Sequence, residues 1–284
     1  ARPLPTPDLK HLLLERIDVH PTDPKEPGPF HNEPRLDFAR EVNRLEMSQA
    51  LAAVGASLGA HRPLVIGGHE TDTGRIITSL NPAHPDQILG TVAAAGPGEA
   101  ERAVQAARAA ATEWRSTAHA ERAAVLFRAA DLMRRERSQL AALAVLEAGK
   151  TWREADAEVI EAIDFLEYYG REILRIAEPR ILGGVPGETN HHFYEPRGVA
   201  AVIAPWNFPL AILTGMTAAA LVAGNTVVMK PASDTPLIAW ELHRLLMEAG
   251  LPPAALAYLP GSGPEVGNYL VEHPEVNVIA FTGS

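Results

Sequence analysis

The chain has 284 residues, of which 46% are hydrophobic and 21% charged, and this is the profile of a folded globular protein. Its formal net charge of −10 argues against nucleic acid or an anionic membrane as a partner, since both require clustered Lys and Arg. No Cys is present, which excludes a disulfide scaffold, a thiolate metal site and a cysteine nucleophile within these residues. The absence of Cys also favours a reducing compartment, and we expect a cytoplasmic protein.

The first part of the chain reads as an extension, a helix and a hairpin. Residues 1–36 are rich in Pro and charge, which predicts a linker or a draped extension. Apolar positions near helical spacing predict a helix over residues 37–58. A β-rich run that begins at Pro63 and a second that begins at Arg75 are predicted to pair as a hairpin, with the turn near Gly67–Gly68.

Helical sequence dominates the middle of the chain. Ala-rich sequence over residues 97–176 predicts three or four helices, with a break at Gly149. Residues 181–196 then resemble a second hairpin, whose polar flanks suit an arm that projects from the body.

The last ninety or so residues alternate between β-rich and helical runs, at the spacing of βαβ units of roughly 30 residues. This pattern predicts a parallel sheet with helices on its faces, and a ligand site beyond the carboxyl ends of the strands. Residues 198–229 lack charge, but Pro and Gly interrupt them, so we expect strand, loop and helix there and no membrane insertion. The predicted strands are 199–204, 226–230, 256–259 and 276–281.

An amide side chain stands between two prolines directly after the first of these strands, in the segment 204–209. The prolines stiffen the backbone on both sides of Asn207. A carboxamide donor on a rigid loop at a strand end is what a developing oxyanion needs. Taken alone, the motif fits equally well a second interpretation, in which Asn207 caps the helix that follows.

Polar and glycine-rich segments follow the other strands. Lys230 and Ser233 could donate to ribose hydroxyls or phosphates, although a solvated Lys followed by an Asp or Thr helix cap is the simpler interpretation of that motif alone. In the glycine loop 260–267, missing side chains would let a cofactor lie against the backbone. Residues 281–284 look like the start of another phosphate-facing turn. No metal site is predicted, because His191–His192 lack partners at metal-ligand spacing.

Four motifs in this order, Pro-Trp-Asn-Phe-Pro, Lys-Pro-Ala, Gly-x-Gly-Pro and Phe-Thr-Gly-Ser, resemble the aldehyde dehydrogenase family. The resemblance covers residues 64–284. Within the family, residues 30–38 and 161–169 are most similar to the branch that oxidises L-glutamate γ-semialdehyde, the pyrroline-5-carboxylate dehydrogenases of proline catabolism. The N-terminal stretch is similar to the joint that precedes this domain in bifunctional proline-utilisation enzymes.

The resemblance implies roles residue by residue. Asn207 would be the amide that holds the oxyanion of the tetrahedral intermediate, and Lys230 and Ser233 would face the adenosine ribose. Glu161 and Phe208 match positions near the substrate. The other implied cofactor positions line the channel, flank the adenine or approach the pyrophosphate: Ile203, Pro205, Trp206, Gly263, Pro264, Gly267, Phe281, Gly283 and Ser284.

The resemblance also implies an α/β fold with a parallel, Rossmann-like cofactor domain. Residues 37–180 would be its helical N-terminal part, residues 181–196 an arm that bridges subunits of a homo-oligomer, and residues 197–284 its βαβ core. The implied cofactor is NAD. NADP is also expected to be accepted, because Ser233 stands where many NAD-specific relatives carry an acidic residue.

One departure from the family pattern is decisive. In the family a cysteine thiolate attacks the aldehyde, hydride passes to the nicotinamide, and a glutamate activates water to release the acid. Both residues lie downstream of the Phe-Thr-Gly-Ser landmark, and the chain contains no Cys. We therefore expect the N-terminal part of an NAD(P)-dependent enzyme that oxidises L-glutamate γ-semialdehyde, inactive by itself. The alternatives are another semialdehyde dehydrogenase, or a non-catalytic module for nucleotide binding or assembly.

Overall fold

The computed structural model describes residue 23 and residues 26–283. Its largest element is a six-stranded sheet with the strand order β11-β8-β9-β10-β2-β3. The first four strands are parallel to one another, as the βαβ spacing predicts. The sheet then continues into an antiparallel hairpin, so it is mixed rather than purely parallel. The strands in that order are Val276–Phe281, Val199–Ile203, Thr226–Lys230, Leu256–Tyr258, Leu64–Ile66 and His69–Thr71.

The hairpin predicted near residue 63 turns at Gly67–Gly68 as expected, but the strand that pairs with its first strand is not the predicted one. Gly67 and Gly68 have φ of 61° and 83°, so the chain reverses at once and β2 pairs with β3. A side chain at Gly68 would lie 2.7 Å from the Cβ atom of Pro253, which leaves no room for another residue. The run after Arg75 pairs instead with a ten-residue strand that sequence analysis did not assign. This second sheet has the order β1-β5-β4, with bounds His61–Arg62, His84–Ala93 and Ile76–Asn81.

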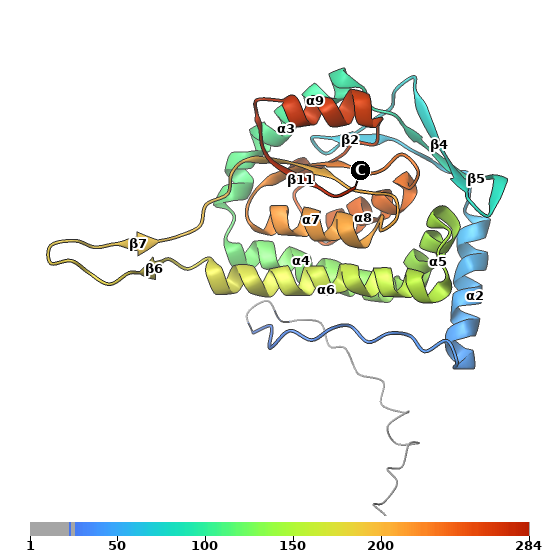
Figure 1. Ribbon diagram of the computed structural model, residues 1–284, viewed down its shortest axis with the longest axis horizontal. Coiled ribbons are helices and arrows are strands. Elements are labelled where there is room, and N and C mark those ends of the chain that lie inside the picture. The colour runs from blue at the N-terminus through green and yellow to red at the C-terminus, as the bar shows by residue number, and fades with distance from the viewer. Residues whose placement is uncertain (1–22, 24–25, 284) are drawn as a thin grey trace, which may run out of the picture.

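Helices cover both faces of the main sheet, and a third layer of helices lies beneath (Figure 1). Helices α3 and α9 lie on one face, and α7 and α8 lie on the other, against α4 and α6. Four helices occupy the Ala-rich region as predicted, and Gly149, with φ of 66°, ends α5. The helices are α2 Glu41–Ala56, α3 Pro97–Ser116, α4 His119–Arg135, α5 Arg137–Ala148, α6 Trp152–Ile176, α7 Ala211–Val222, α8 Pro236–Glu248 and α9 Asn268–Glu272, with a 3₁₀ turn at Pro253–Ala255.

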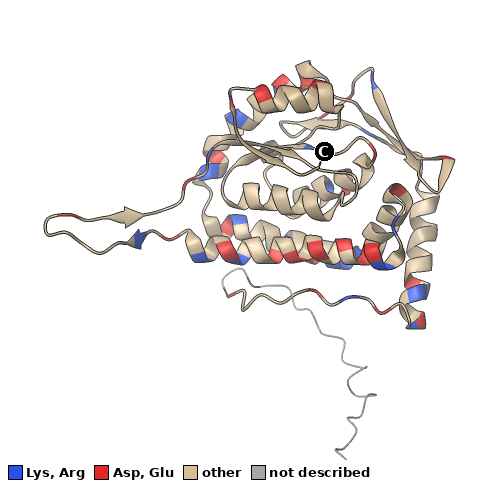
Figure 2. Cartoon of the chain, in the orientation of Figure 1, with Lys and Arg blue, Asp and Glu red and all other residues tan. Residues whose placement is uncertain are grey.

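Successive side chains of the parallel strands point to opposite faces of the sheet, and they form an apolar core on each face. Ala201 and Val228 pack on the α3 and α9 side, whereas Ala200 and Val227 pack on the side of α7 and α8. All four side chains are fully buried, and charged residues concentrate on the outer helices while α7 carries none (Figure 2). The central strands β8, β9 and β10 are therefore buried on both faces, as the inner strands of a parallel sheet require, whereas the edge strands β11 and β3 are partly exposed.

The predicted second hairpin is present as a two-stranded sheet of β6, Arg180–Ile181, and β7, His191–His192. It extends away from the rest of the chain (Figure 1). Its apolar side chains are open to solvent, with Ile181 76% exposed and Tyr194 62% exposed. Two short strands with no covering layer are marginally stable alone.

The part of the N-terminal extension that the structure describes, from residue 26 onward, lies along helix α6 (Figure 1). Asn32 donates to the carboxylate of Asp164 at 2.7 Å, and the Leu36 amide donates to Asp156 at 3.0 Å. Residues 1–22 and 24–25 of the predicted linker lie outside the described residues. Within the described part of the chain, no helix is both long and apolar enough to cross a membrane.

A buried carboxylate holds the start of helix α8. Glu147, at the end of α5, accepts hydrogen bonds from the amides of Leu237 and Ile238, both at 2.8 Å, and from the Ser79 hydroxyl at 2.7 Å. It thereby satisfies amides that have no partner within the helix. Burial nevertheless raises the pKa of Glu147 from 4.5 to about 7, because the hydrogen bonds offset only part of the lost hydration.

This shift predicts a pH-dependent stability. The folded protein binds the Glu147 proton more tightly than the unfolded chain, so the stabilisation is complete below pH 4.5 and is lost as the pH rises to about 7. The full loss amounts to about 3 kcal/mol of unfolding free energy. Denaturant unfolding at about pH 5 and about pH 8 measures it, and Glu147→Gln should flatten the dependence. Parallel pH profiles for the two proteins would show that Glu147 does not titrate in this range.

Candidate active site

The candidate site lies at the carboxyl ends of the parallel strands, where three predicted cofactor residues end neighbouring strands. Ile203 of β8 is in register with Lys230 of β9 on one side and with Phe281 of β11 on the other. The pairing continues past the strand ends, because the Ala204 amide donates to the Lys230 carbonyl and the Thr282 amide to the Ile203 carbonyl, at 3.3 and 3.2 Å. The loops that follow these strands therefore begin side by side.

The first and last of these loops meet at Pro205 and Gly283. A Cβ atom built on Gly283 would lie 3.5 Å from the Cβ atom of Pro205, and the φ of Gly283 is 133°, which favours glycine. The structure thus joins two residues that the resemblance assigns to one cofactor site. Ser284, the remaining member of that motif, lies outside the described residues.

Lys230 is buried, with 5% of its surface exposed, so the interpretation of this residue as a solvated Lys is wrong. Its stem runs past Gly267, whose built Cβ would lie 3.7 Å from the Lys230 Cε atom. The ammonium donates to the Pro231 carbonyl at 3.2 Å, and burial lowers its pKa. An ammonium has three N–H donors, and among the described residues this single bond is the only one it makes.

The glycine loop also contacts the segment that follows β9. Ser233 donates to the Gly261 carbonyl at 3.4 Å, which joins the segment after β9 to the loop after β10. The loop continues as a π-helical turn, Gly263–Gly267, that leads into α9. Gly263 and Pro264 are exposed, and no atom lies within 4 Å of a Cβ built on Gly263. Packing within the described chain therefore does not require glycine at residue 263.

Asn207 is exposed on the loop between β8 and α7, beside Trp206 and Phe208, which are 56% and 41% exposed. Its carboxamide makes no hydrogen bond to any described residue, and the interpretation of Asn207 as a helix cap is wrong. Helix α7 begins later, at Ala211, and its N-cap residue Leu210 makes no side-chain capping hydrogen bond. Asn207 is therefore free to donate to a ligand.

A buried glutamate on another helix holds the start of α7 instead. Oε1 of Glu158, which is fully buried in α6, accepts from the Leu210 amide at 2.7 Å and from the Ala211 amide at 3.4 Å. Burial raises the pKa of Glu158. Its Oε2 lies 3.0 Å from Nζ of Lys150, and this ammonium lies 4.3 Å from the centre of the Phe208 ring.

Sequence reasoning missed Lys150 and Glu158. The only signals were the break at Gly149, directly before Lys150, and the position of Glu158 three residues before the predicted substrate residue Glu161. Glu161 is exposed on α6, one turn beyond Glu158. Glu161 and Phe208 are both exposed, and their shared role at a substrate site stays a prediction.

The aldehyde dehydrogenase family matches residues 69–284 of this chain. The chain belongs to the aldehyde dehydrogenase family. A 1-pyrroline-5-carboxylate dehydrogenase of Geobacillus thermodenitrificans is 51% identical over 256 residues, which are 90% of this chain and 50% of the relative. A Bacillus subtilis protein, 1-pyrroline-5-carboxylate dehydrogenase 2, is 48% identical over the same shares of the two chains.

Solved structures of this aldehyde dehydrogenase branch share the fold. A 1-pyrroline-5-carboxylate dehydrogenase from Thermus with bound NAD has a TM-score of 0.88 and 47% identity, over 90% of this chain and 50% of its own. Proline utilization A from Bdellovibrio bacteriovorus also has a TM-score of 0.88, with 49% identity over 92% of this chain and 27% of its own. The chain thus spans about half the length of the curated relatives it matches.

Proposed function

We propose that this chain is the cofactor-binding part of an enzyme that oxidises L-glutamate γ-semialdehyde to L-glutamate with NAD(P), in proline catabolism. The observation that carries the proposal is an exposed Asn207 carboxamide with no hydrogen bond to any described residue, at the same sheet edge as the buried Lys230 and the open glycine loop. The names of the relatives, at 51% and 48% identity, support the choice of substrate. We also propose a cytoplasmic location, which rests on the absence of Cys.

The residues at the sheet edge fit a dinucleotide. Lys230 has spare N–H donors in a buried position, which a ribose hydroxyl would satisfy, and the surface at Gly263 is open to a flat ring. When bound, the nicotinamide of NAD(P) supplies the hydride acceptor. Ser233 would face the ribose beside Lys230. The channel would be lined by Ile203, Pro205 and Trp206, and the adenine would be flanked by Pro264 and Gly267. Phe281 and Gly283 would lie nearer the pyrophosphate.

Asn207 would act on the substrate oxygen. Its Nδ2 donates to the aldehyde oxygen, and the bond strengthens as that oxygen gains negative charge in the tetrahedral intermediate. Phe208 and Glu161 would contact the substrate beside it. The nucleophile must come from outside these 284 residues, because they contain no Cys.

Reduction of NAD(P) by glutamate γ-semialdehyde tests the proposal, in the protein as its gene encodes it. We expect turnover that depends on both reactants, and a kcat/KM at least about tenfold above that for an unsubstituted aldehyde of similar length. Residues 1–284 expressed alone are the control and should give no turnover, since they lack a thiol. Cofactor binding without oxidation of any aldehyde would contradict the proposal and favour a nucleotide-binding module.

Cofactor choice is expected to depend on Ser233. A hydroxyl tolerates both a ribose 2′-hydroxyl and a 2′-phosphate, whereas a carboxylate accepts from the former and repels the latter. Ser233→Glu should therefore lower kcat/KM for NADP by about tenfold or more while sparing NAD. Measured kcat/KM values for both cofactors decide this. Strict exclusion of NADP by the unmodified enzyme would contradict the role given to Ser233.

We propose that the arm formed by residues 181–196 pairs with a second copy of the chain. Its exposed Ile181 and Tyr194 would then be buried in a homo-oligomer. Deletion of residues 183–189 should lower the oligomer mass measured by light scattering, whereas Glu188→Gln at the exposed tip should leave it unchanged. An oligomer that survives the deletion would show that another surface holds the subunits together.

A further inference from the structure

Two glutamates from the helical layer hold the two helices that follow the site strands, but only one of them reaches the Asn207 loop. Glu147 accepts the first amides of α8, and Glu158 accepts the first amides of α7. Both are buried, so each supplies a fixed acceptor where a helix would otherwise have unpaired N–H groups. Glu158 alone carries a charged partner, Lys150, which extends toward the loop.

Lys150 contacts the Asn207 loop through the ring of Phe208. Asn207 has no side-chain hydrogen bond within the described chain, so only its neighbours fix where its amide points. The next residue, Phe208, has its ring 4.3 Å from the Lys150 ammonium, and the Leu210 amide lies 2.7 Å from Glu158. A cation over an aromatic face is attracted to it, most strongly where water is excluded, and the Lys150 side chain is 10% exposed.

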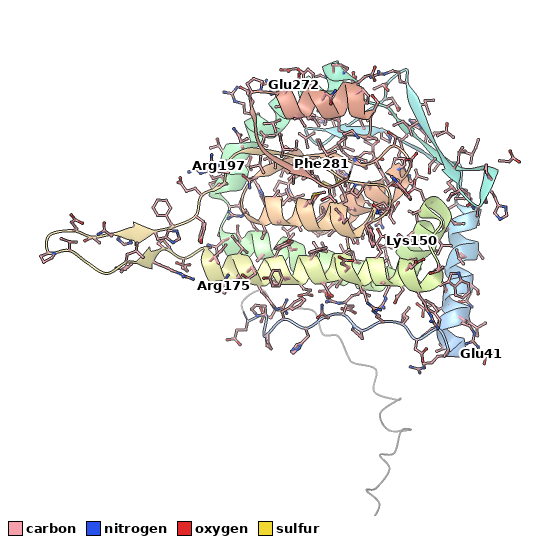
Figure 3. The ribbon with its side chains drawn as sticks, in the orientation of Figure 1. Glu41, Lys150, Arg175, Arg197, Glu272 and Phe281 are labelled. Atoms are coloured by element: carbon pink, nitrogen blue, oxygen red, sulfur yellow. The ribbon has the colours of Figure 1, made fainter. Side chains whose placement is uncertain are left out.

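We infer that Lys150 and Glu158 are positioning residues that act through Asn207: the ammonium holds the Phe208 ring while the carboxylate holds the first turn of α7. The inference rests on the proposed function, because it assigns the pair to the oxyanion amide. Figure 3 labels Lys150 in the turn between α5 and α6, and Phe281 at the end of β11. The pair thus approaches the site from the helical layer rather than from the sheet.

A double-mutant cycle on kcat tests the pair in the protein as its gene encodes it. Lys150→Met removes the charge and keeps the stem, and it should lower kcat about tenfold or more through misplacement of the amide. In an Asn207→Ala background the same change should lower kcat less than about twofold, since nothing is left to position. Lys150→Arg should retain more activity than Lys150→Met, because a guanidinium both pairs with a carboxylate and stacks on a ring.

Hydrogen exchange gives a readout that does not need activity. Lys150→Met should speed amide exchange in a peptide that covers residues 205–215 and leave residues 234–240 unchanged. Glu147→Gln is the matched control. It should speed amide exchange in residues 234–240, leave exchange in residues 205–215 unchanged, and keep kcat within about twofold of the unmodified enzyme. If the unmodified enzyme oxidises no aldehyde, the proposed function fails, while the exchange pattern still decides whether the pair holds the loop. Equal losses of kcat in both backgrounds, or unchanged exchange in residues 205–215, would overturn the inference.

Discussion

Asn207→Ala is expected to lower kcat by a factor of 10² to 10³ while cofactor binding changes little. The loss of one preorganised oxyanion donor typically costs about 2.7–4 kcal/mol of transition-state stabilisation. Folding should be nearly unaffected, because the carboxamide is exposed and makes no hydrogen bond to the described chain. Steady-state kcat and the dissociation constant of NAD, measured on the same preparation, separate the two effects.

Asn207→Asp is the control for shape. It keeps the size of the side chain but replaces the N–H donor with a carboxylate that repels a developing oxyanion, so its kcat should fall at least as far as that of Asn207→Ala. A variant at Asn207 that keeps its kcat and loses unfolding free energy instead would show that the residue is structural.

Glu158→Ala is expected to lower the free energy of unfolding by about 3–5 kcal/mol, as removal of one member of a buried ion pair typically does. The change leaves the amides of Leu210 and Ala211 without an acceptor and the Lys150 ammonium without a counter-charge. Glu161→Ala, one turn further along the same helix, is the matched control. Glu161 is exposed, and its loss should cost less than about 0.5 kcal/mol.

Denaturant unfolding monitored by circular dichroism gives both values. Similar losses for Glu158→Ala and Glu161→Ala would contradict the stabilising role given to the buried pair. The Glu158→Ala profile should also show a lower midpoint with an unchanged slope, since the mutation removes contacts without altering the surface exposed on unfolding.

The βαβ core could be predicted from the sequence because its signals are local. Each strand is a short β-rich run, and a parallel sheet brings the ends of such runs to one edge. That rule alone places Ile203, Lys230 and Phe281 together, and the register confirms it. The order of the motifs identified the family before any contact was known, and the family match confirms it.

The contacts that support the site could not be predicted in the same way. Glu158 and Leu210 are 52 residues apart in the sequence, and Glu147 and Leu237 are 90 apart. A glutamate in an Ala-rich helix reads as a solvent-facing residue unless the fold shows what lies above it. The partner of strand β2 was missed for a different reason, because two adjacent glycines with positive φ reverse the chain at once and bring the short strand β3 beside β2.

A crystal structure of the full protein with NAD bound tests whether the edge formed by β11, β8, β9 and β10 is the dinucleotide site. We expect the adenosine ribose within hydrogen-bond distance of Lys230, the adenine beside Gly263, and the nicotinamide on the side of the edge that carries Asn207. A dinucleotide bound elsewhere on the chain, or bound with Lys230 out of reach of the ribose, would contradict it.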